Sequence, residues 1–304
     1  MSKLTPEEVS QLEAEVNEKV TVLGTNPPPP PREPMSRLQK SALWIAFIAV
    51  IAGPLWLAVA ALGSKFGLWS FGFGLGKMTF QWSKYVLFAG VAISAIALII
   101  QLLKAPRRGS IFALILLMVP IMILGRMNGV GQVAAGLPPI HDVQTDWNNP
   151  IRFSDALLAE REANGWNPVL DSPVVPASAA GRWPDAVGKT NKELQAESYA
   201  KFNLRPQLLE IRPEIAFEAA IEVAKKEGME IVSADAKTGR IHATYTSFWY
   251  GFVDDVMIQV DPQGKVGSKV NVRSVSRVGL SDLGANATRI NSFIEALNFA
   301  LSNR

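Results

Sequence analysis

The stretch "NVRSVSRVGLSDLGANATRI", residues 271–290, joins a strand pattern to a helical pattern and so decides the fold. Up to Val278 the side chains alternate between two faces. One face has Val270, Val272, Ser274, Ser276 and Val278, and the other has Asn271, Arg273, Val275 and Arg277. After Gly279, apolar residues recur at helical spacing over residues 283–301, which predicts an amphipathic helix on the valine face of a sheet.

The segments before this stretch extend the pattern to a whole domain. Strands are predicted at residues 229–234, 239–248, 253–261 and 266–278, and their short connections predict an antiparallel meander. A short strand at 207–211 precedes them, followed by a helix that Pro213 opens and Gly228 closes. The predicted fold of residues 207–304 is an α+β two-layer sandwich, with an antiparallel four- to five-stranded sheet and two helices on one face.

The face of the sheet that the helices leave open is predicted to carry charge. Asp255 falls on the same face as Arg273 and Arg277 in either hairpin register that keeps the valines inside. We therefore expect an exposed ion pair on this face, and its arginines are candidate contacts for a ligand or partner. Ser281 or Asp282 is expected to cap the final helix, which explains both residues without a functional role.

Residues 41–126 have the composition of a membrane module, with seven Lys or Arg and no Asp or Glu. Uncharged apolar runs at residues 41–62, 85–103 and 111–124 predict three transmembrane helices. The third run is short and contains Pro120, so a buried or re-entrant segment is the alternative. Basic residues are densest before the first span and at Arg107 and Arg108, which predicts a cytoplasmic N-terminus and a C-terminal domain across the membrane.

A short arm precedes the spans, over residues 1–40. Thr5 and Glu8 form a capping box, so a helix is expected to start near Pro6. Its apolar stripe predicts a partner helix, a second copy or a lipid surface, and the alternative is a solvated tail; the stripe residues are Val9, Leu12, Val16 and Leu23. Five prolines at 27–31 predict a stiff spacer. Residues 127–206 are expected to form an irregular lead-in that wraps the domain.

Composition excludes several kinds of chemistry. The chain has no cysteine, which rules out disulfides and thiol catalysis. The basic pI of 9.1 comes from the membrane module and is no sign of nucleic-acid binding. His141, Asp142 and Asp146 could offer metal ligands, but a hydrogen-bonded loop is the favoured interpretation. Asp254 and Asp255 fall on opposite strand faces, which argues against a shared proton, so we assign no catalytic residue, metal or cofactor.

Aromatic residues gather at the connection between the second and third strands of the meander. Trp249 and Tyr250 stand at its centre, flanked by Tyr245, Phe248 and Phe252. Beside the arginine face, they could bind a lipid or an anionic ligand. The alternative is a hairpin end that packs into the domain core.

Three blocks resemble a family of bacterial and plastid membrane-associated proteins known only as a domain of unknown function. They are "PPIHDVQTDWNNPIRF" at 138–153, "GRIHATYTSFWYGFVDDVMIQV" at 239–260 and "VNVRSVSRVGLSDLGANATRI" at 270–290. The resemblance covers residues 137–301 and implies an envelope or organelle membrane location, with no activity or cofactor assigned. It adds weight, as a group, to His141, Asp142, Asp146, Asp254, Asp255, Arg273, Arg277, Ser281, Asp282 and Asn286.

These observations combine into one functional hypothesis and two alternatives. We expect an accessory or scaffold subunit of the bacterial inner membrane, with a periplasmic C-terminal domain that binds lipids or a membrane protein complex. The first alternative is a module for an envelope lipid or anionic ligand, and a hydrolytic enzyme is the less favoured one. The candidate binding residues are Arg273, Arg277, Asp255, Trp249, Tyr250, His141 and Asp142.

Overall fold

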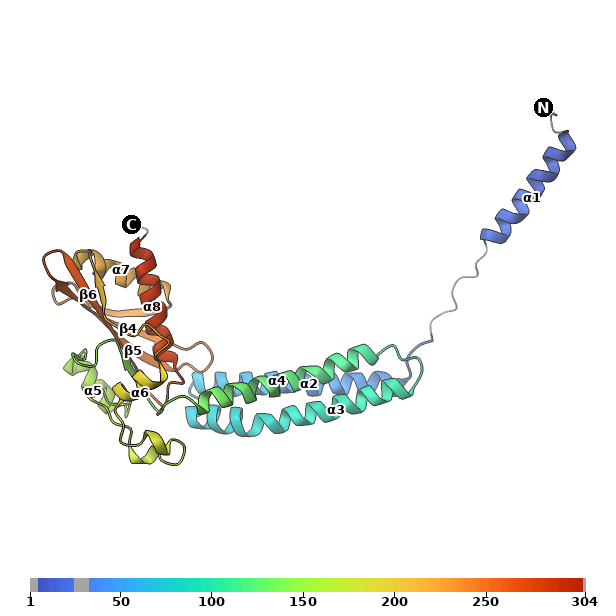
Figure 1. The fold of residues 1–304 in the computed structure, drawn as a ribbon. Coiled ribbons are helices and arrows are strands. Elements are labelled where there is room, and N and C mark those ends of the chain that lie inside the picture. Colours follow the sequence, from blue (N-terminus) through green and yellow to red (C-terminus); the bar gives the residue numbers. More distant parts are fainter. Residues whose placement is uncertain (1–4, 25–32, 303–304) are drawn as a thin grey trace.

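The computed structural model describes residues 5–24 and 33–302, as a bundle of long helices with an α+β domain at one end (Figure 1). The predicted spacer at 27–31 lies outside the described residues. The first helix, α1 (Pro6–Gly24), begins where the capping box predicts, with the Thr5 amide donating to Glu8 at 2.8 Å. Three residues of its predicted stripe face solvent, with Val9, Leu12 and Val16 exposed by 42%, 50% and 55%, and the side chain of Leu23 lies outside the described part of the chain.

The bundle consists of α2 (Arg37–Lys65), α3 (Ser83–Leu103) and α4 (Ser110–Ala135), with a π-helical segment (Gly72–Trp82) ahead of α3. Within the described residues, three helices are long and apolar enough to cross a membrane. The third is longer than expected, because residues 128–135 continue α4 instead of forming an extended lead-in. At 1.5 Å per residue, α4 reaches about 39 Å, enough for a bilayer core of roughly 30 Å.

Small side chains and buried amides hold the three helices together. Ala46 and Ala97 are fully or almost fully buried where α2 crosses α3. At the end of the bundle where α2 begins, Gln39 donates to the carbonyls of Lys104 and Pro106 at 3.0 and 3.1 Å. Gln101 donates back to the Gln39 carbonyl at 2.9 Å. The two bonds from Gln39 satisfy carbonyls that would otherwise lack partners at the turn between α3 and α4, and the bond from Gln101 ties that turn to the start of α2.

Within the described residues the α+β domain contains one six-stranded antiparallel sheet. The meander of β3 (Glu230–Asp235), β4 (Arg240–Thr246), β5 (Val253–Gln263) and β6 (Gly267–Ser276) is confirmed. Both β1 (Asp142–Gln144) and β2 (Gln207–Leu209) pair with β6 on its other side. The sheet therefore has one strand more than the expected maximum, because β1 comes from the segment just after the bundle.

Two helices cover one face of the sheet, as the sequence predicts. They are α7 (Pro213–Lys226) and α8 (Ala285–Ser302). Val270 and Val272 of β6 share a core with the α8 stripe, in which Ile290 and Leu297 are fully buried. Burial of such side chains typically contributes about 1.5 to 3 kcal/mol each.

The opposite face is closed, and the prediction of an open, charged face is wrong. Residues 145–206 include α5 (Asp155–Ala163), α6 (Asn191–Ser198) and two short 3₁₀ turns (Ala177–Ala179 and Pro184–Ala186), so this segment is more ordered than expected. Phe153, just before α5, and Leu157, in its first turn, form a second small core with Met257 and Val275 of the sheet. This cover shields the arginine face from solvent.

Candidate functional site

A buried ion network lies between the sheet and its α5 cover; its members are Asp142, Arg161, His242, Asp255, Arg273 and Arg277. Arg273 donates through Nε to Oδ1 of Asp142 at 3.0 Å and through Nη2 to Oδ2 at 2.6 Å. Its remaining donors reach the carbonyls of Ile151 and Leu170 at 2.8 and 2.6 Å. Arg273 and Asp142 have no exposed side-chain surface, so each charge is compensated inside the domain.

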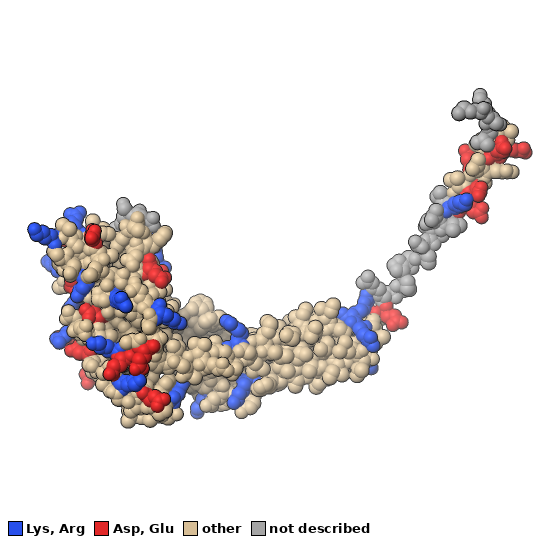
Figure 2. Space-filling model, in the orientation of Figure 1, with Lys and Arg blue, Asp and Glu red and all other residues tan. Residues whose placement is uncertain are grey.

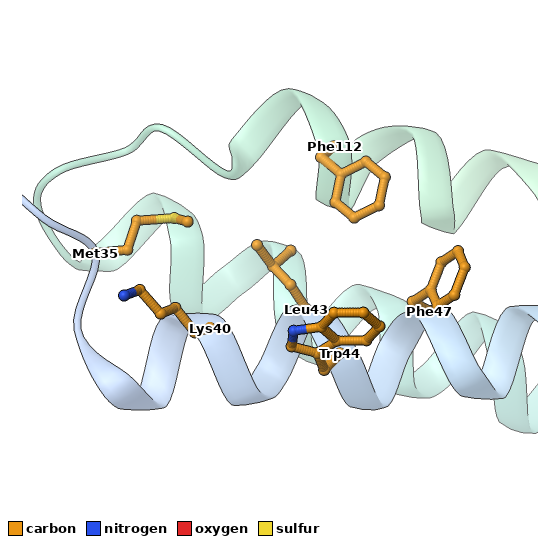
Figure 3. A pocket seen from close by; sticks show the side chains of 6 residues that line it. All are labelled: Met35, Lys40, Leu43, Trp44, Phe47 and Phe112. Carbon is orange, nitrogen blue, oxygen red and sulfur yellow. The ribbon is translucent and has the colours of Figure 1, made fainter.

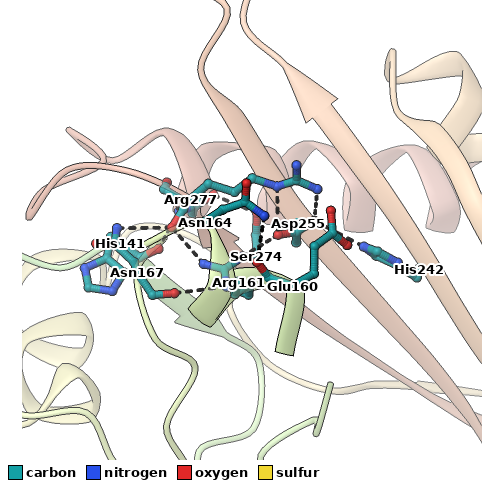
Figure 4. A network of polar contacts seen from close by, with 11 residues as sticks. His141, Glu160, Arg161, Asn164, Asn167, His242, Asp255, Ser274 and Arg277 are labelled. Carbon is teal, nitrogen blue, oxygen red and sulfur yellow. Dashed lines mark hydrogen bonds and ion pairs between the residues drawn. The ribbon is translucent and has the colours of Figure 1, made fainter. Parts of the chain in front are cut away.

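Asp255 is the centre of the other half of the network (Figure 4). Its carboxylate accepts from Nη1 of Arg161 and, at 2.8 and 3.1 Å, from Nη2 and Nε of Arg277. His242 Nε2 lies 3.2 Å from its Oδ1 atom. Burial acts to raise the pKa of Asp255, but the hydrogen bonds from His242 and Arg277 hold that pKa down at about 2. The carboxylate is therefore ionised and saturated with donors at neutral pH.

The arginines differ in how far they are enclosed. Arg273 is completely buried, so the expectation that it projects to solvent is wrong. The side chain of Arg277 keeps 18% of its surface exposed, and its guanidinium lies 3.9 Å over the ring of Trp166. In the observed register Asp255 lies opposite Val275 and Met257 lies opposite Arg273. Arg273 consequently pairs with Asp142 rather than with Asp255.

Arg161 is the member that the sequence analysis missed. It lies on α5 with a fully enclosed side chain and donates to the carbonyls of Asn167 and Ser276 as well as to Asp255. Burial lowers its pKa, and Asp255 opposes that effect. The capping Ser154 and the spacing of Leu157 and Arg161 were the signals for a helix with one face turned inward.

Asp254 points to the other face, as expected, where Arg289 of α8 donates to it at 2.7 Å. At the junction before α8, Asp282 accepts from the amides of Gly284 and Asn286 at 2.9 and 2.8 Å, so its side chain caps the first turn although the helix itself begins only at Ala285. Burial raises the pKa of Asp282 to about 6. Ser281 donates to the carbonyl of Pro138 at 2.9 Å, so both residues serve the junction.

His141 contributes mainly through its backbone. Its carbonyl accepts from the amide of Ser276 at 2.8 Å and from the Asn286 side chain at 3.0 Å. Burial is the main reason why the pKa of the ring is lowered. Within residues 5–24 and 33–302, no group of three or more His, Cys, Asp or Glu side chains is arranged to hold a metal ion. Asp146 instead accepts from the amides of Asn148 and Asn149 in a turn.

The aromatic hairpin tip, residues 247–252 between β4 and β5, packs on the helix bundle instead of the domain core. Tyr250 and Thr79 share a hydrogen bond of 2.6 Å between their hydroxyls. Lys65, the last residue of α2, donates to the carbonyl of Phe248 at 2.8 Å. The Phe252 ring lies 4.7 Å from that of Phe71. The tip thereby attaches the α+β domain to the bundle.

A groove of about 680 Å³, here called the hairpin groove, lies beside this tip. Helices α2 and α4 supply apolar walls, and the tip adds two aromatic side chains; the lining includes Leu57, Ala58, Met122, Arg126, Trp249 and Tyr250. A smaller pocket of about 310 Å³ lies at the other end of the bundle, where Lys40 accompanies Leu43, Trp44, Phe47 and Phe112 (Figure 3). Lys and Arg gather at both ends of a bundle surface that is otherwise almost free of charge (Figure 2).

Comparison with known proteins identifies the α+β domain. A family model described as "Protein of unknown function (DUF1499)" matches residues 142–297, from the start of β1 into α8. The chain belongs to the DUF1499 family. This confirms the family resemblance, and the DUF1499 match includes every member of the buried ion network.

Two further comparisons accompany the DUF1499 match. No curated protein matches the chain significantly. Among solved structures, the chain is similar to the crystal structure of TTHA0849 from Thermus thermophilus, at 11% identity and a TM-score of 0.23. That similarity covers 32% of this chain and 94% of the other.

Proposed function

We propose that this DUF1499 chain is a membrane-anchored accessory subunit that connects a partner at one end of its bundle to the α+β domain at the other. The observation that carries the proposal is the attachment of the hairpin tip through Lys65, Thr79 and Phe71. A domain held to its membrane helices at a second point, besides the chain connection, suits a scaffold because its position is fixed. The ion network supports a structural role, because its charged side chains pair with one another inside the domain.

The proposed partner-binding element is α1. Its stripe of Val9, Leu12 and Val16 is exposed on an otherwise acidic helix. A helix with one exposed apolar stripe gains stability by packing that stripe against another surface. Because α1 precedes the end of the bundle at Arg37, its partner would meet the chain at the end opposite the α+β domain (Figure 1).

The proposed location is a bacterial inner membrane, with α1 in the cytoplasm and the α+β domain in the periplasm. The support is the uneven distribution of basic residues around the helix ends. Arg37, Lys40, Lys104, Arg107 and Arg108 gather at the end that would face the cytoplasm.

Copurification of the full chain from native membranes in mild detergent tests the subunit role. One variant replaces Val9, Leu12 and Val16 by serine, and a matched control replaces Gln11, Ala14 and Glu18, on the opposite side of α1, by serine. We expect a stoichiometric protein subunit with the wild type and the control, and its loss from the stripe variant. If the subunit stays with the stripe variant, α1 is not the docking element. If no subunit accompanies the wild type, the accessory role is wrong.

A second candidate function is the binding of a membrane lipid or an anionic envelope component. The hairpin groove favours it, because apolar walls, two aromatic side chains and the cationic Arg126 meet there. Lipid analysis of the same purified chain tests this candidate, and the absence of any enriched lipid would contradict it.

A further inference from the structure

The hairpin groove lies where membrane helices and the α+β domain meet. Its walls come from α2 and α4, which carry no charge between Ser41 and Ser64 and between Ser110 and Gly125. Trp249 and Tyr250 reach it from the hairpin tip, on the domain side. Aromatic side chains with a polar atom are typical of the level at which lipid headgroups meet hydrocarbon. The groove volume of about 680 Å³ is in the range of ligand sites, roughly 300–1,000 Å³.

Arg126 is the cation in this lining and follows directly on the apolar run of α4. Its side chain is exposed, and among the described residues it makes no hydrogen bond, ion pair or ring contact. By contrast, Lys65 at the same end is engaged with Phe248, and Lys84 lies 5.2 Å from the ring of Tyr85. Arg126 also lines a second, smaller groove with Val133, Leu137 and Leu283, so apolar surface lies on both sides of its guanidinium.

A free guanidinium between two apolar grooves suits an amphipathic anion. Acyl chains would cover the apolar walls, and a phosphate would accept two parallel hydrogen bonds from the guanidinium, a geometry that arginine provides and lysine does not. A neutral sterol or an uncharged acylglycerol would leave Arg126 without a partner. A water-soluble phosphate would leave the walls uncovered. Both halves of the site are used only by a ligand that combines the two chemistries.

We propose that the hairpin groove binds a glycerophospholipid with an anionic headgroup, with an acyl chain between α2 and α4 and the phosphate on Arg126. This inference rests on the second candidate function and assigns it a site and a ligand class. The bound lipid lies against the hairpin tip and thereby bridges the bundle to the α+β domain. Trp249, which is 55% exposed, loses solvent contact when the groove is filled.

The test uses the full chain in phosphatidylcholine nanodiscs that contain a minor share of phosphatidylglycerol with a photoreactive group on its acyl chain. Mapping of the labelled peptides shows which helices the probe touches. We expect preferential labelling of α2 near Ala58 and of α4 near Met122. A photoreactive phosphatidylcholine probe, used at the same share, should label these segments less.

Two variants and one control distinguish binding of the lipid in the groove from general attraction of anionic lipid to basic residues. Arg126→Gln removes the headgroup contact and should lower phosphatidylglycerol labelling about fivefold, from roughly 1 kcal/mol per basic residue at an anionic surface. Ala58→Phe fills the groove and should abolish labelling at α2 while Arg126 is retained. Lys84→Gln removes a charge at the same end of the bundle, away from the groove, and should leave labelling unchanged. An unchanged thermal unfolding midpoint for Arg126→Gln checks that the fold is intact.

Each contrary result overturns the proposal in a distinct way. Equal labelling of Arg126→Gln and wild type shows that Arg126 does not hold the lipid, and equal loss in Lys84→Gln shows only general charge attraction. Equal labelling by both probes rules out selection for an anionic headgroup. If Ala58→Phe keeps the lipid but loses a copurified protein subunit, the groove is a protein-docking surface. Labelling spread evenly over all lipid-facing helices contradicts the second candidate function itself.

Discussion

Arg273 donates to both carboxylate oxygens of Asp142, at 3.0 and 2.6 Å, and so links β6 to β1 inside the domain. Removal of either partner leaves a buried charge without compensation, which typically costs about 3 to 5 kcal/mol. We therefore expect Arg273→Ala to lower the thermal unfolding midpoint of the purified full chain more than Val272→Ala, whose cost should be about 1 to 3 kcal/mol. The double variant Asp142→Leu with Arg273→Met should recover part of the loss. An Arg273→Ala variant that unfolds like the wild type would disprove the burial of this pair.

The carboxylate of Asp255 should make stability sensitive to acid. Its pKa is about 2 in the folded chain and about 3.8 without these contacts, so its stabilising effect is complete above about pH 4 and is lost as pH falls toward 2. Asp255→Asn should be less stable at neutral pH and should lack this part of the acid dependence. The measurement is the urea midpoint between pH 5 and pH 2, followed by tryptophan fluorescence. Asp171→Asn, at an exposed ion pair, should keep the wild-type profile.

Asp282 should act in the opposite direction and in a different pH window. Because its folded pKa is raised to about 6 from about 3.8, the folded chain binds more protons than the unfolded chain between these values. Stability from this group therefore falls as pH rises from about 4 to about 6. As pH rises across that window, the unfolding midpoint of the wild type should fall relative to that of Asp282→Asn. A constant difference would show that the carboxyl titrates normally.

Attachment of the hairpin tip should be visible in amide hydrogen exchange. Tyr250→Phe removes the 2.6 Å bond to Thr79, and Lys65→Met removes the 2.8 Å bond to the Phe248 carbonyl. At about 1 kcal/mol per bond, each should speed exchange of residues 247–252 about fivefold. Lys77→Met is the control, since Lys77 lies near Phe73 rather than at the tip. Equal exchange in all four proteins would mean that the tip is not held by these bonds.

The proposed topology can be tested independently of the fold. Reporter fusions after Gly136 should give alkaline phosphatase activity and little green fluorescence, because that position follows α4 on the proposed periplasmic side. Arg107→Glu together with Arg108→Glu should weaken this asymmetry by removing positive charge from the proposed cytoplasmic end. Strong fluorescence with no phosphatase activity would place the α+β domain in the cytoplasm.

Long periodic patterns predicted the fold well. The meander and the α8 stripe are confirmed because each repeats its period over many residues, so single exceptions do not hide it. β1 was missed because three residues are too few to show alternation, and it belongs to the sheet only through pairing with a distant strand. For α6, the capping box of Thr190 and Glu193 was available in the sequence, as it was for α1.

The sequence predicted which charged residues of the candidate site share a face of the sheet, but it did not predict that this face is buried. Asp255, Arg277 and Arg273 do lie on one face of the sheet, as strand alternation requires. What covers that face depends on α5, whose position follows from tertiary packing of Phe153 and Leu157 and from no local pattern around the arginines. The sequence did not indicate Arg126 as a binding residue, because the residues that line the groove with it, Trp249 and Tyr250, are distant in the chain.

Asp142 and Arg273 are 131 positions apart in the chain, so the ribosome makes Asp142 well before its partner. Asp142 leaves the ribosome soon after the third helix, whereas its counter-charge follows at synthesis rates of about 5–20 residues per second, on the order of ten seconds later. During that interval β1 has no strand to pair with, because β6 has not yet been made. The newborn domain must therefore remain open on this side of the sheet until β6 has been made.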